Sequence, residues 1–169
     1  GSEMCIRDSS AALNKYNWLK AIALIGGASK MFVTDAILDG LKENFEPTIE
    51  NIVKYSWYKN TGAFFKQKAR QRMLEAGSKV VHDDFYACGQ FDVSDRLAEI
   101  DIPALVIASD HDRMVPLKIS REMAGQLSRS TFVTLENCGH FQHIEQTSRV
   151  AKELGNYLST LTNRVGSMR

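Results

Sequence analysis

The chain has 169 residues with 21 Lys and Arg against 20 Asp and Glu, a formal net charge of +1. This near equality of positive and negative side chains argues against a nucleic-acid partner, because binding to a phosphate backbone depends on an excess of cations. A hydrophobic content of 44% with 24% charged residues excludes disordered, collagen-like and coiled-coil proteins. One ordinary globular domain is expected.

The cysteines and the apolar runs bear on the protein's compartment. Cys5, Cys88 and Cys138 lie far apart and form neither a disulfide framework nor a Cys-x-x-Cys motif, which favours a reducing, cytoplasmic location. The longest nearly apolar run, residues 21–28, is far shorter than the roughly 20 residues that cross a bilayer. We therefore expect no membrane partner.

The two ends of the chain are set apart from the domain. Residues 4–9 show no clear periodicity and resemble linker-derived sequence at the ends of assembled environmental (metagenomic) reading frames. We interpret residues 1–10 as a tag or foreign leader and residues 164–169 as a polar tail. On this interpretation the N-terminal part of the domain is absent from the chain.

The first predicted elements are the last turns of a helix at residues 11–16 and a buried strand at residues 19–25, which ends at a Gly-Gly pair. From residue 34 to about residue 100 the pattern becomes helical. The clearest helical face follows the spacing i, i+3, i+4, i+7 and i+8, and comprises Ile49, Ile52, Val53, Ser56 and Trp57. We expect an all-helical insert over residues 31–100.

Two further helices are predicted within this insert. The first has a face at spacing i, i+4, i+8 and i+11, made of Phe65, Ala69, Met73 and Ala76, before a C-terminal Gly77. The second is marked by Val81, Phe85 and Cys88. A capping-like sequence from Asp92 then predicts a short helix that carries Leu97 and Ile100.

The last third of the chain alternates strands and helices. Residues 103–108 form a continuous apolar run, typical of a parallel strand covered on both faces. A helix at 117–127, a strand at 131–135 and a helix containing residues 150–161 follow. This order predicts an α/β fold with right-handed parallel crossovers, built from residues 11–30 and 101–163.

Polar loops follow the last two predicted strands. The first contains Asp110, His111 and Asp112, and the second contains His140 and His143. Because ligands bind beyond the carboxyl ends of the strands in open parallel sheets, these loops are the candidate functional site.

These segments resemble the C-terminal part of an α/β-hydrolase: Ile-x-x-Pro before an apolar strand, Asp-x-x-Val-Pro after it, then a helix, a strand and Gly-His. The resemblance covers most of residues 11–161. It implies a partial parallel sheet with a helical cap over residues 31–100, with Asp112 as the acid and His140 as the general base of a catalytic triad. In this family the nucleophile precedes both along the chain.

The sequence departs from the family pattern at the nucleophile. It contains no Gly-x-Ser-x-Gly, and Ser9 and Ser10 lack the flanking glycines. We therefore expect a serine hydrolase by ancestry, esterase-like and acting on a small apolar acyl substrate, whose serine is missing from this chain, so that the chain itself is inactive. The alternative is a truncated remnant that binds a small ligand or associates with itself.

Several secondary assignments complete the prediction. We expect no cofactor and no metal, although Asp110, Asp112, His140, His143 and Glu145 offer a possible ligand cluster. Cys138 is interpreted as a buried structural thiol. A homo-oligomer through the exposed edge of the sheet is expected. The candidate pocket residues are Trp57, Phe64, Phe85, Met114 and Phe141.

Overall fold

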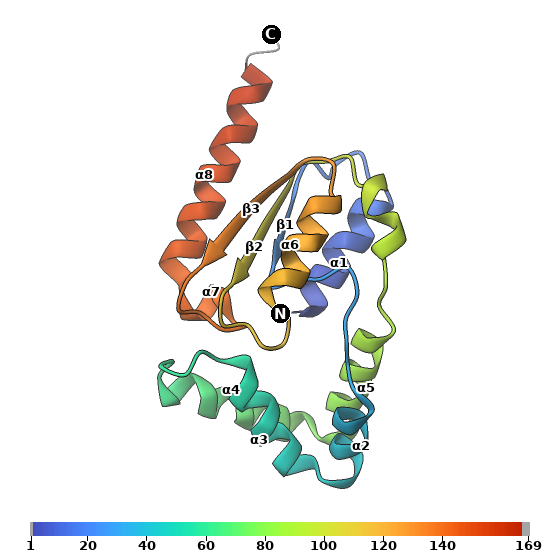
Figure 1. The fold of residues 1–169 in the computed structure, drawn as a ribbon, viewed down its shortest axis with the longest axis vertical. Helices are drawn as coiled ribbons and strands as arrows, with labels where there is room; N and C mark the ends of the chain where they lie inside the picture. Colours follow the sequence, from blue (N-terminus) through green and yellow to red (C-terminus); the bar gives the residue numbers. More distant parts are fainter. Residues whose placement is uncertain (1, 167–169) are drawn as a thin grey trace.

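A computed structural model describes the backbone of residues 2–166 and the side chains of residues 8–162 (Figure 1). Its elements, in chain order, are α1 (Ser2–Leu13), β1 (Ile22–Ile25), α2 (Asp35–Glu43), α3 (Phe45–Ser56), α4 (Ala63–Ala76), α5 (Ser78–Gly89), the 3₁₀ helix η1 (Ser94–Glu99), β2 (Ala104–Ser109), α6 (Leu117–Gln126), β3 (Ser130–Leu135), α7 (Gln142–Glu145) and α8 (Thr147–Gly166).

The three strands form one parallel sheet in the order β1-β2-β3. Ile22 is aligned with Ala104, and Ala104 with Ser130. The α/β class with parallel crossovers is thus confirmed. The first strand is shorter than expected, because the backbone N–H of Leu19 donates to the carbonyl of Tyr16 in a turn that precedes the strand.

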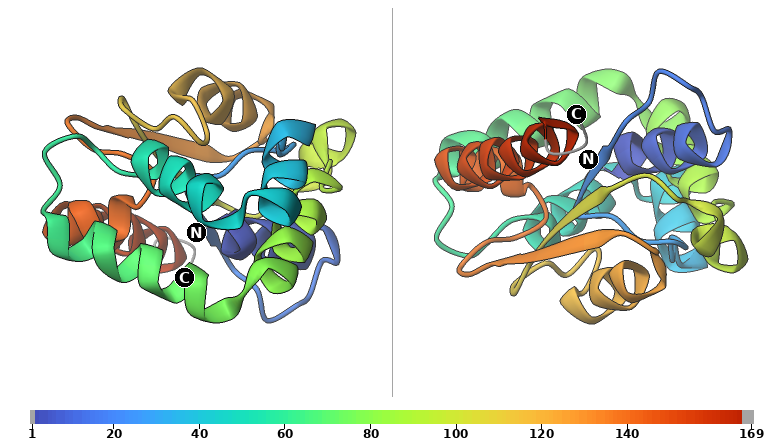
Figure 2. Two further views of the ribbon diagram at one scale, coloured as in Figure 1. Left: turned by 90° about the horizontal axis from the view of Figure 1, so that it is seen from below. Right: turned by 90° about the horizontal axis from the view of Figure 1, so that it is seen from above.

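The central strand β2 is buried on both faces, as its unbroken apolar sequence predicts. Ala104 and Val106 pack against α1 and α6, whereas Leu105 and Ile107 pack against α8. Both pairs are fully buried because successive strand residues point to opposite faces, and helices cover each face (Figure 2).

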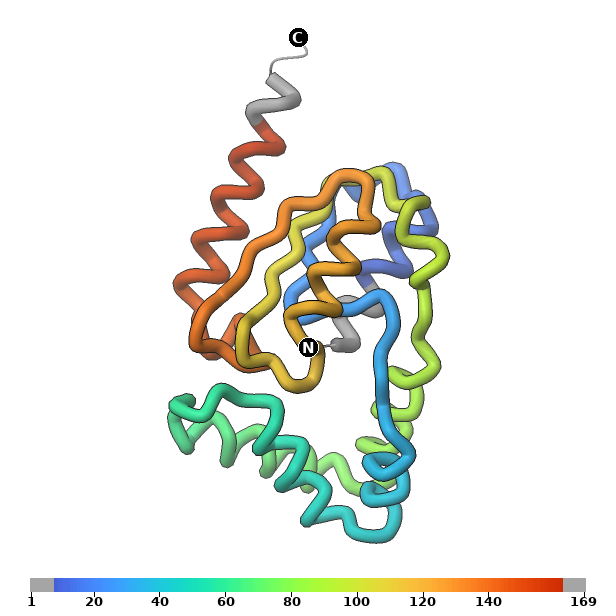
Figure 3. Tube along the Cα trace, viewed as in Figure 1, coloured from blue at the N-terminus to red at the C-terminus, as the bar shows by residue number. Residues whose placement is uncertain are grey.

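Helices α2 to α5 lie between β1 and β2 in the chain and form a separate layer beyond the carboxyl ends of the strands; we call this layer the helical insert (Figure 3). The predicted face of α3 is confirmed, since all five of its residues are buried. The predicted face of α4 is wrong in part: Ala69 and Met73 are partly buried, but Phe65 is 44% exposed. Helix α4 lies at the outside of the insert, where it packs mainly against α3.

Helices extend into both ends that the sequence set apart. Residues 2–10, interpreted as a leader, are helical and form most of α1, and Ser9 is buried. Helix α8 extends to Gly166, so residues 164–166 of the expected tail are helical. Residue 1 and residues 167–169 of the expected ends lie outside the described residues. Among the described helices, none is long and apolar enough to cross a bilayer.

Candidate active site

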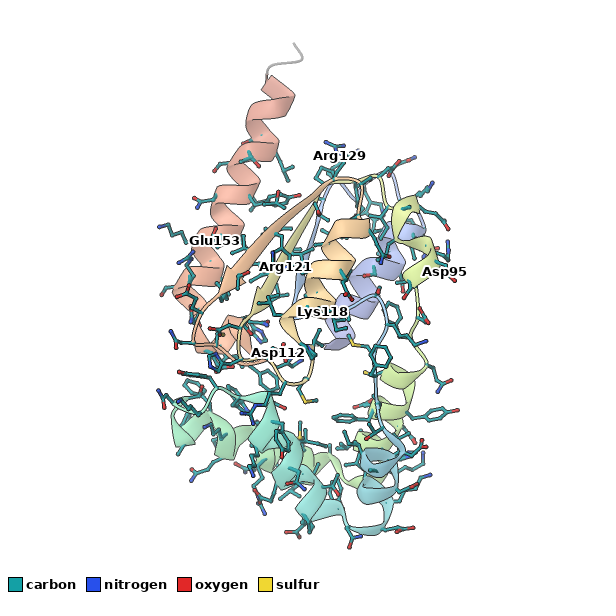
Figure 4. The ribbon with its side chains drawn as sticks, in the orientation of Figure 1. Asp95, Asp112, Lys118, Arg121, Arg129 and Glu153 are labelled. Carbon is teal, nitrogen blue, oxygen red and sulfur yellow. The ribbon has the colours of Figure 1, made fainter. Side chains whose placement is uncertain are left out.

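The loop after β2 (residues 110–116, the acid loop) and the loop after β3 (residues 136–141, the histidine loop) meet at the edge of the sheet that faces the helical insert. Asp112 lies at this edge (Figure 4). Its Oδ2 is 2.8 Å from Nδ1 of His140, although the two residues are 28 positions apart in the chain. Their side chains are 1% and 7% exposed.

The carboxylate of Asp112 is held in place by several donors. Oδ1 accepts the backbone N–H groups of Met114 and Val115, each at 2.8 Å. Oδ2 accepts a hydrogen bond from Nε2 of Gln142 at 3.4 Å, in addition to the one from the imidazole of His140. Because a carboxylate only accepts, Nδ1 of His140 is the protonated nitrogen, and Nε2 keeps its lone pair. Among the described residues, Nε2 has no hydrogen-bond partner, so it is free to act as a base.

The backbone of the histidine loop is fixed against helix α3. The N–H of His140 donates to the carbonyl of Ser56 at 2.8 Å. A Cβ on Gly139 would lie 2.5 Å from the backbone nitrogen of Tyr58 and 2.7 Å from the carbonyl carbon of Trp57. Only glycine allows the histidine loop to approach the helical insert this closely.

Glu145 of the short helix α7 reinforces this contact. Oε2 accepts the backbone N–H of Tyr58 at 2.9 Å and the hydroxyl of Thr61 at 2.6 Å. Oε1 accepts the N–H of Gly139 at 3.1 Å. One carboxylate therefore joins the histidine loop to the segment between α3 and α4.

Gln142 and Ser109 belong to the site but were not foreseen from the sequence. Gln142 is fully buried, and its Nε2 also donates to Oγ of Ser109 at 3.2 Å. The hydroxyl of Ser109 in turn donates to the carbonyl of Gly139 at 2.6 Å. The only sequence signal for this support is the position of Gln142, two residues after His140, because nothing local shows that this amide is buried.

An apolar cavity of about 360 Å³ opens beside His140, between the sheet and the helical insert. Of the five predicted pocket residues, Phe85, Met114 and Phe141 line it. Trp57 does not, because it lies behind Phe141, with the ring centroids 4.4 Å apart. Phe64 points away and is 64% exposed. The apolar wall also contains residues that the sequence analysis did not assign to the pocket, among them Met31, Phe32, Val33, Ile52, Met73 and Val81.

The carboxylates and histidines of the two loops are not gathered into one cluster. Asp110 pairs with His111 at 2.7 Å, and Glu145 is engaged by the donors described above. Burial opposes ionisation of Asp110, but hydrogen bonds from His111 and from two backbone N–H groups outweigh it and lower the pKa of its carboxyl. In the part of the chain that the structure describes, no three His, Cys, Asp or Glu side chains are grouped as metal ligands.

Cys138 is fully buried next to this site. Burial, together with the negative charges of Glu145, Asp110 and Asp112, raises the pKa of its thiol to about 12. A thiol with so high a pKa is a poor nucleophile at neutral pH.

A parallel sheet with an inserted helical layer and a buried Asp–His pair beyond its strand ends defines a hydrolase-type α/β protein. The family model of the alpha/beta hydrolase fold matches residues 39–147, more than half of the chain. The chain belongs to the α/β-hydrolase family.

Individual relatives agree with this assignment. The chain is 39% identical over 75 residues to RutD of Pseudomonas syringae pv. syringae, described as a candidate carbamate hydrolase, covering 44% of this chain and 29% of RutD. It is 24% identical over 116 residues to the AB hydrolase superfamily protein YisY of Bacillus subtilis, covering 69% of this chain and 43% of YisY. The chain thus spans less than half the length of these relatives.

Solved structures share the fold. A thermophilic esterase matches with a TM-score of 0.86 and 22% identity, over 93% of this chain and 63% of that one. The enol-lactonase from Burkholderia xenovorans matches with a TM-score of 0.84 and 18% identity, over 94% of this chain and 63% of that one. At these identities the likeness concerns the fold alone.

Proposed function

We propose that this chain carries the acid and the base of a serine hydrolase that cleaves carboxylic esters with small apolar acyl groups. The observation that carries the proposal is the buried hydrogen bond between Nδ1 of His140 and Oδ2 of Asp112. It leaves Nε2 of His140 as the basic nitrogen next to an apolar cavity of about 360 Å³, a size suited to a small acyl chain.

In this mechanism, Nε2 of His140 removes the proton of a serine hydroxyl while the serine oxygen attacks the ester carbonyl. The ester C–O bond then breaks, and the imidazolium gives that proton to the departing alkoxide, which leaves as an alcohol while the acyl group stays on the serine as an acyl-enzyme. Water attacks the acyl-enzyme in the same way and releases the acid. Asp112 keeps Nδ1 protonated and stabilises the imidazolium.

The serine itself is proposed to lie outside this chain, in a segment that precedes α1. Ser9, within α1, is a poor substitute because its side chain is 1% exposed. The helical insert would then act as the cap of the family, and its residues would form the apolar wall of the acyl pocket. Of the five pocket residues predicted from the sequence, Phe85, Met114 and Phe141 are the proposed contacts with the acyl group.

The test begins with the source DNA upstream of the codon for Ala11. An in-frame Gly-x-Ser-x-Gly ahead of a helix is expected, and a reading frame without a nucleophile there would overturn the proposal. In protein expressed from the longer frame, His140→Ala and Asp112→Asn should each lower kcat for 4-nitrophenyl butyrate by about 10³-fold or more. Cys138→Ser should leave kcat within a few-fold and serves as the buried control.

The present chain also permits a test without turnover. The Nδ1–H of His140 should give a far-downfield proton resonance in NMR spectra, which His140→Ala and Asp112→Asn both remove. Retention of that resonance in Asp112→Asn would contradict the assigned pair.

The second candidate is a non-catalytic module that binds a small apolar ligand. The cavity favours it, because the side chains named for the cavity wall all lie within this chain. The present chain would then bind 4-nitrophenyl butyrate and hydrolyse it at the same rate as His140→Ala. Faster hydrolysis by the unaltered chain would instead show a functioning nucleophile.

A further inference from the structure

A second hollow, of about 440 Å³, lies on the other side of the Trp57–Phe141 ring pair from the apolar cavity. It is formed by α3, the segment between α3 and α4, the first turn of α4 and the acid loop. It differs from the first in charge, since four cationic side chains line it: Lys54, Lys59, Lys66 and Arg113.

The positive charge of this hollow is not neutralised within the chain. The one carboxylate in its wall, Glu50, is paired with Arg70. None of the four cations lies within ion-pair distance of a carboxylate among the described residues. His111, also in the wall, is hydrogen-bonded through Nδ1 to Oδ1 of Asp110 at 2.7 Å. The hollow therefore presents a local excess of positive charge on a chain that is nearly neutral as a whole.

The cations are held in two pairs, although Lys54, Lys59 and Arg113 are exposed. Nζ of Lys54 and Cζ of Arg113 lie 5.6 and 5.7 Å from the centre of the same Tyr55 ring. Nζ of Lys66, which is half-buried, donates to the carbonyl of Lys59 at 3.1 Å. These contacts reduce the conformational entropy that the side chains would lose on binding a ligand.

The wall between these cations is also fixed. Tyr58 is held at both ends by hydrogen bonds. Its backbone N–H donates to the carboxylate of Glu145, and its hydroxyl donates to Oδ1 of Asn137 at 3.0 Å. Trp57 is buried, and its indole N–H has no acceptor among the described residues. Apart from Glu50, the charged side chains that line the hollow are thus all cationic, and they stand beside a fixed aromatic wall.

We propose that this hollow binds a small phosphate-bearing polyanion. A single carboxylate would neutralise only one of the four cations, whereas a di- or triphosphate group matches several at once. Arginine and lysine are both established phosphate ligands, the first through its planar fork and the second as a point charge. The site is separate from the Asp112–His140 pair and does not depend on the activity proposed for that pair.

The probe is inorganic pyrophosphate, titrated into the full chain by calorimetry at about 0.1 M salt, where screening removes weak long-range attraction. Saturable one-to-one binding is expected. Arg113→Gln and Lys66→Gln should each weaken it by about fivefold or more, since each removes a charge-assisted contact. The matched controls are Arg129→Gln, at the opposite end of the sheet, and Lys118→Gln on α6, neither of which should change the affinity by more than about twofold (Figure 4).

A second readout locates the ligand. Trp18→Phe leaves Trp57 as the sole tryptophan, so a pyrophosphate-dependent change in its fluorescence reports on the wall of the hollow. Absence of saturable binding, or binding that Arg113→Gln and Arg129→Gln weaken equally, would overturn the proposal. Tighter binding of citrate than of pyrophosphate would overturn the assignment to phosphate. Unchanged thermal unfolding of the variants confirms that the exposed substitutions leave the fold intact.

Discussion

The carboxylate of Glu145 accepts a hydrogen bond from the backbone N–H of Tyr58 at 2.9 Å, and this bond ties the histidine loop to the helical insert. Glu145 also accepts from Thr61 and from the N–H of Gly139. The position of His140 relative to α3 therefore depends on a residue five places further along the chain, which the acid–base chemistry does not use.

We expect Glu145→Ala to lower the free energy of unfolding by about 2 kcal/mol, because it leaves partly buried donors without an acceptor. Glu145→Gln keeps one carbonyl and should cost less. Urea denaturation measures both. The control is Glu122→Gln, which removes an exposed i,i+4 pair and should change stability by less than about 0.5 kcal/mol. Equal effects of Glu145→Ala and Glu122→Gln would show that the three bonds contribute nothing.

Gly139→Ala should be strongly destabilising, because the added Cβ would overlap backbone atoms of Trp57 and Tyr58 that cannot rotate away. A loss of about 2–3 kcal/mol is expected from such overpacking. The same substitution at Gly155 of α8, where no atom lies within 4 Å of the added Cβ, should instead stabilise the helix by about 0.5–1 kcal/mol. Thermal unfolding of the two variants measures both effects. An unchanged stability of Gly139→Ala would mean that the histidine loop moves away from the helical insert without a cost in free energy.

Cys138 should react very slowly with a thiol reagent in the folded protein. With a pKa of about 12, only on the order of 10⁻⁴ of the thiol is ionised at pH 8. A Cys5→Ser/Cys88→Ser variant isolates this thiol, and its labelling with a disulfide reagent is expected to require unfolding by urea. Rapid labelling without urea would contradict the buried, uncharged state.

The same raised pKa predicts a loss of stability at alkaline pH. An unfolded thiol ionises near pH 8.5, whereas the folded one stays protonated to about pH 12, so the folded state binds more protons between these values. The contribution is constant below about pH 8 and is lost progressively as the pH rises above it. In urea denaturation at a series of pH values, Cys138→Ala should reduce the fall in the free energy of unfolding above about pH 8. An equal fall in the variant and the unaltered chain would contradict the raised pKa of Cys138.

Strand β1 pairs with β2 on one side, and on its other side no described strand adds to the sheet. A free strand edge attracts further strands, so we expect this chain to self-associate. Light scattering after size exclusion should show a species larger than the monomer at high concentration. Ala23→Lys, which places a charge on the edge strand, should shift it toward the monomer. A monomer at all concentrations would refute the expectation.

Much of the fold follows from local patterns. The unbroken apolar run at β2 predicts burial on both faces, and the 3.6-residue period of α3 predicts its buried side. The parallel topology follows from the alternation of elements, since consecutive parallel strands need a helical crossover. The placement of Asp112 and His140 at one edge of the sheet follows in turn, because parallel strands end on the same side.

The lining of the apolar cavity could not be predicted in the same way. Phe64 and Phe85 are both aromatic residues on helices, yet one is exposed and the other lines the cavity. Helical spacing shows which residues share a face, but which face is covered depends on neighbours supplied by distant parts of the chain. Met31, Phe32 and Val33 reach the cavity from an irregular segment with no periodic signal.

The sequence by itself therefore determined the class of fold and the alternation of its strands and helices, because these depend on hydrophobic period and chain order. Its resemblance to the α/β-hydrolases, and not the period, singled out the pair of Asp112 and His140. Only the tertiary structure decided that Gln142 and Glu145 support that pair, that Trp57 and Phe141 divide two cavities, and that four cations surround one of them. Those relations join residues far apart in the chain, and packing rather than local preference sets the distances between them.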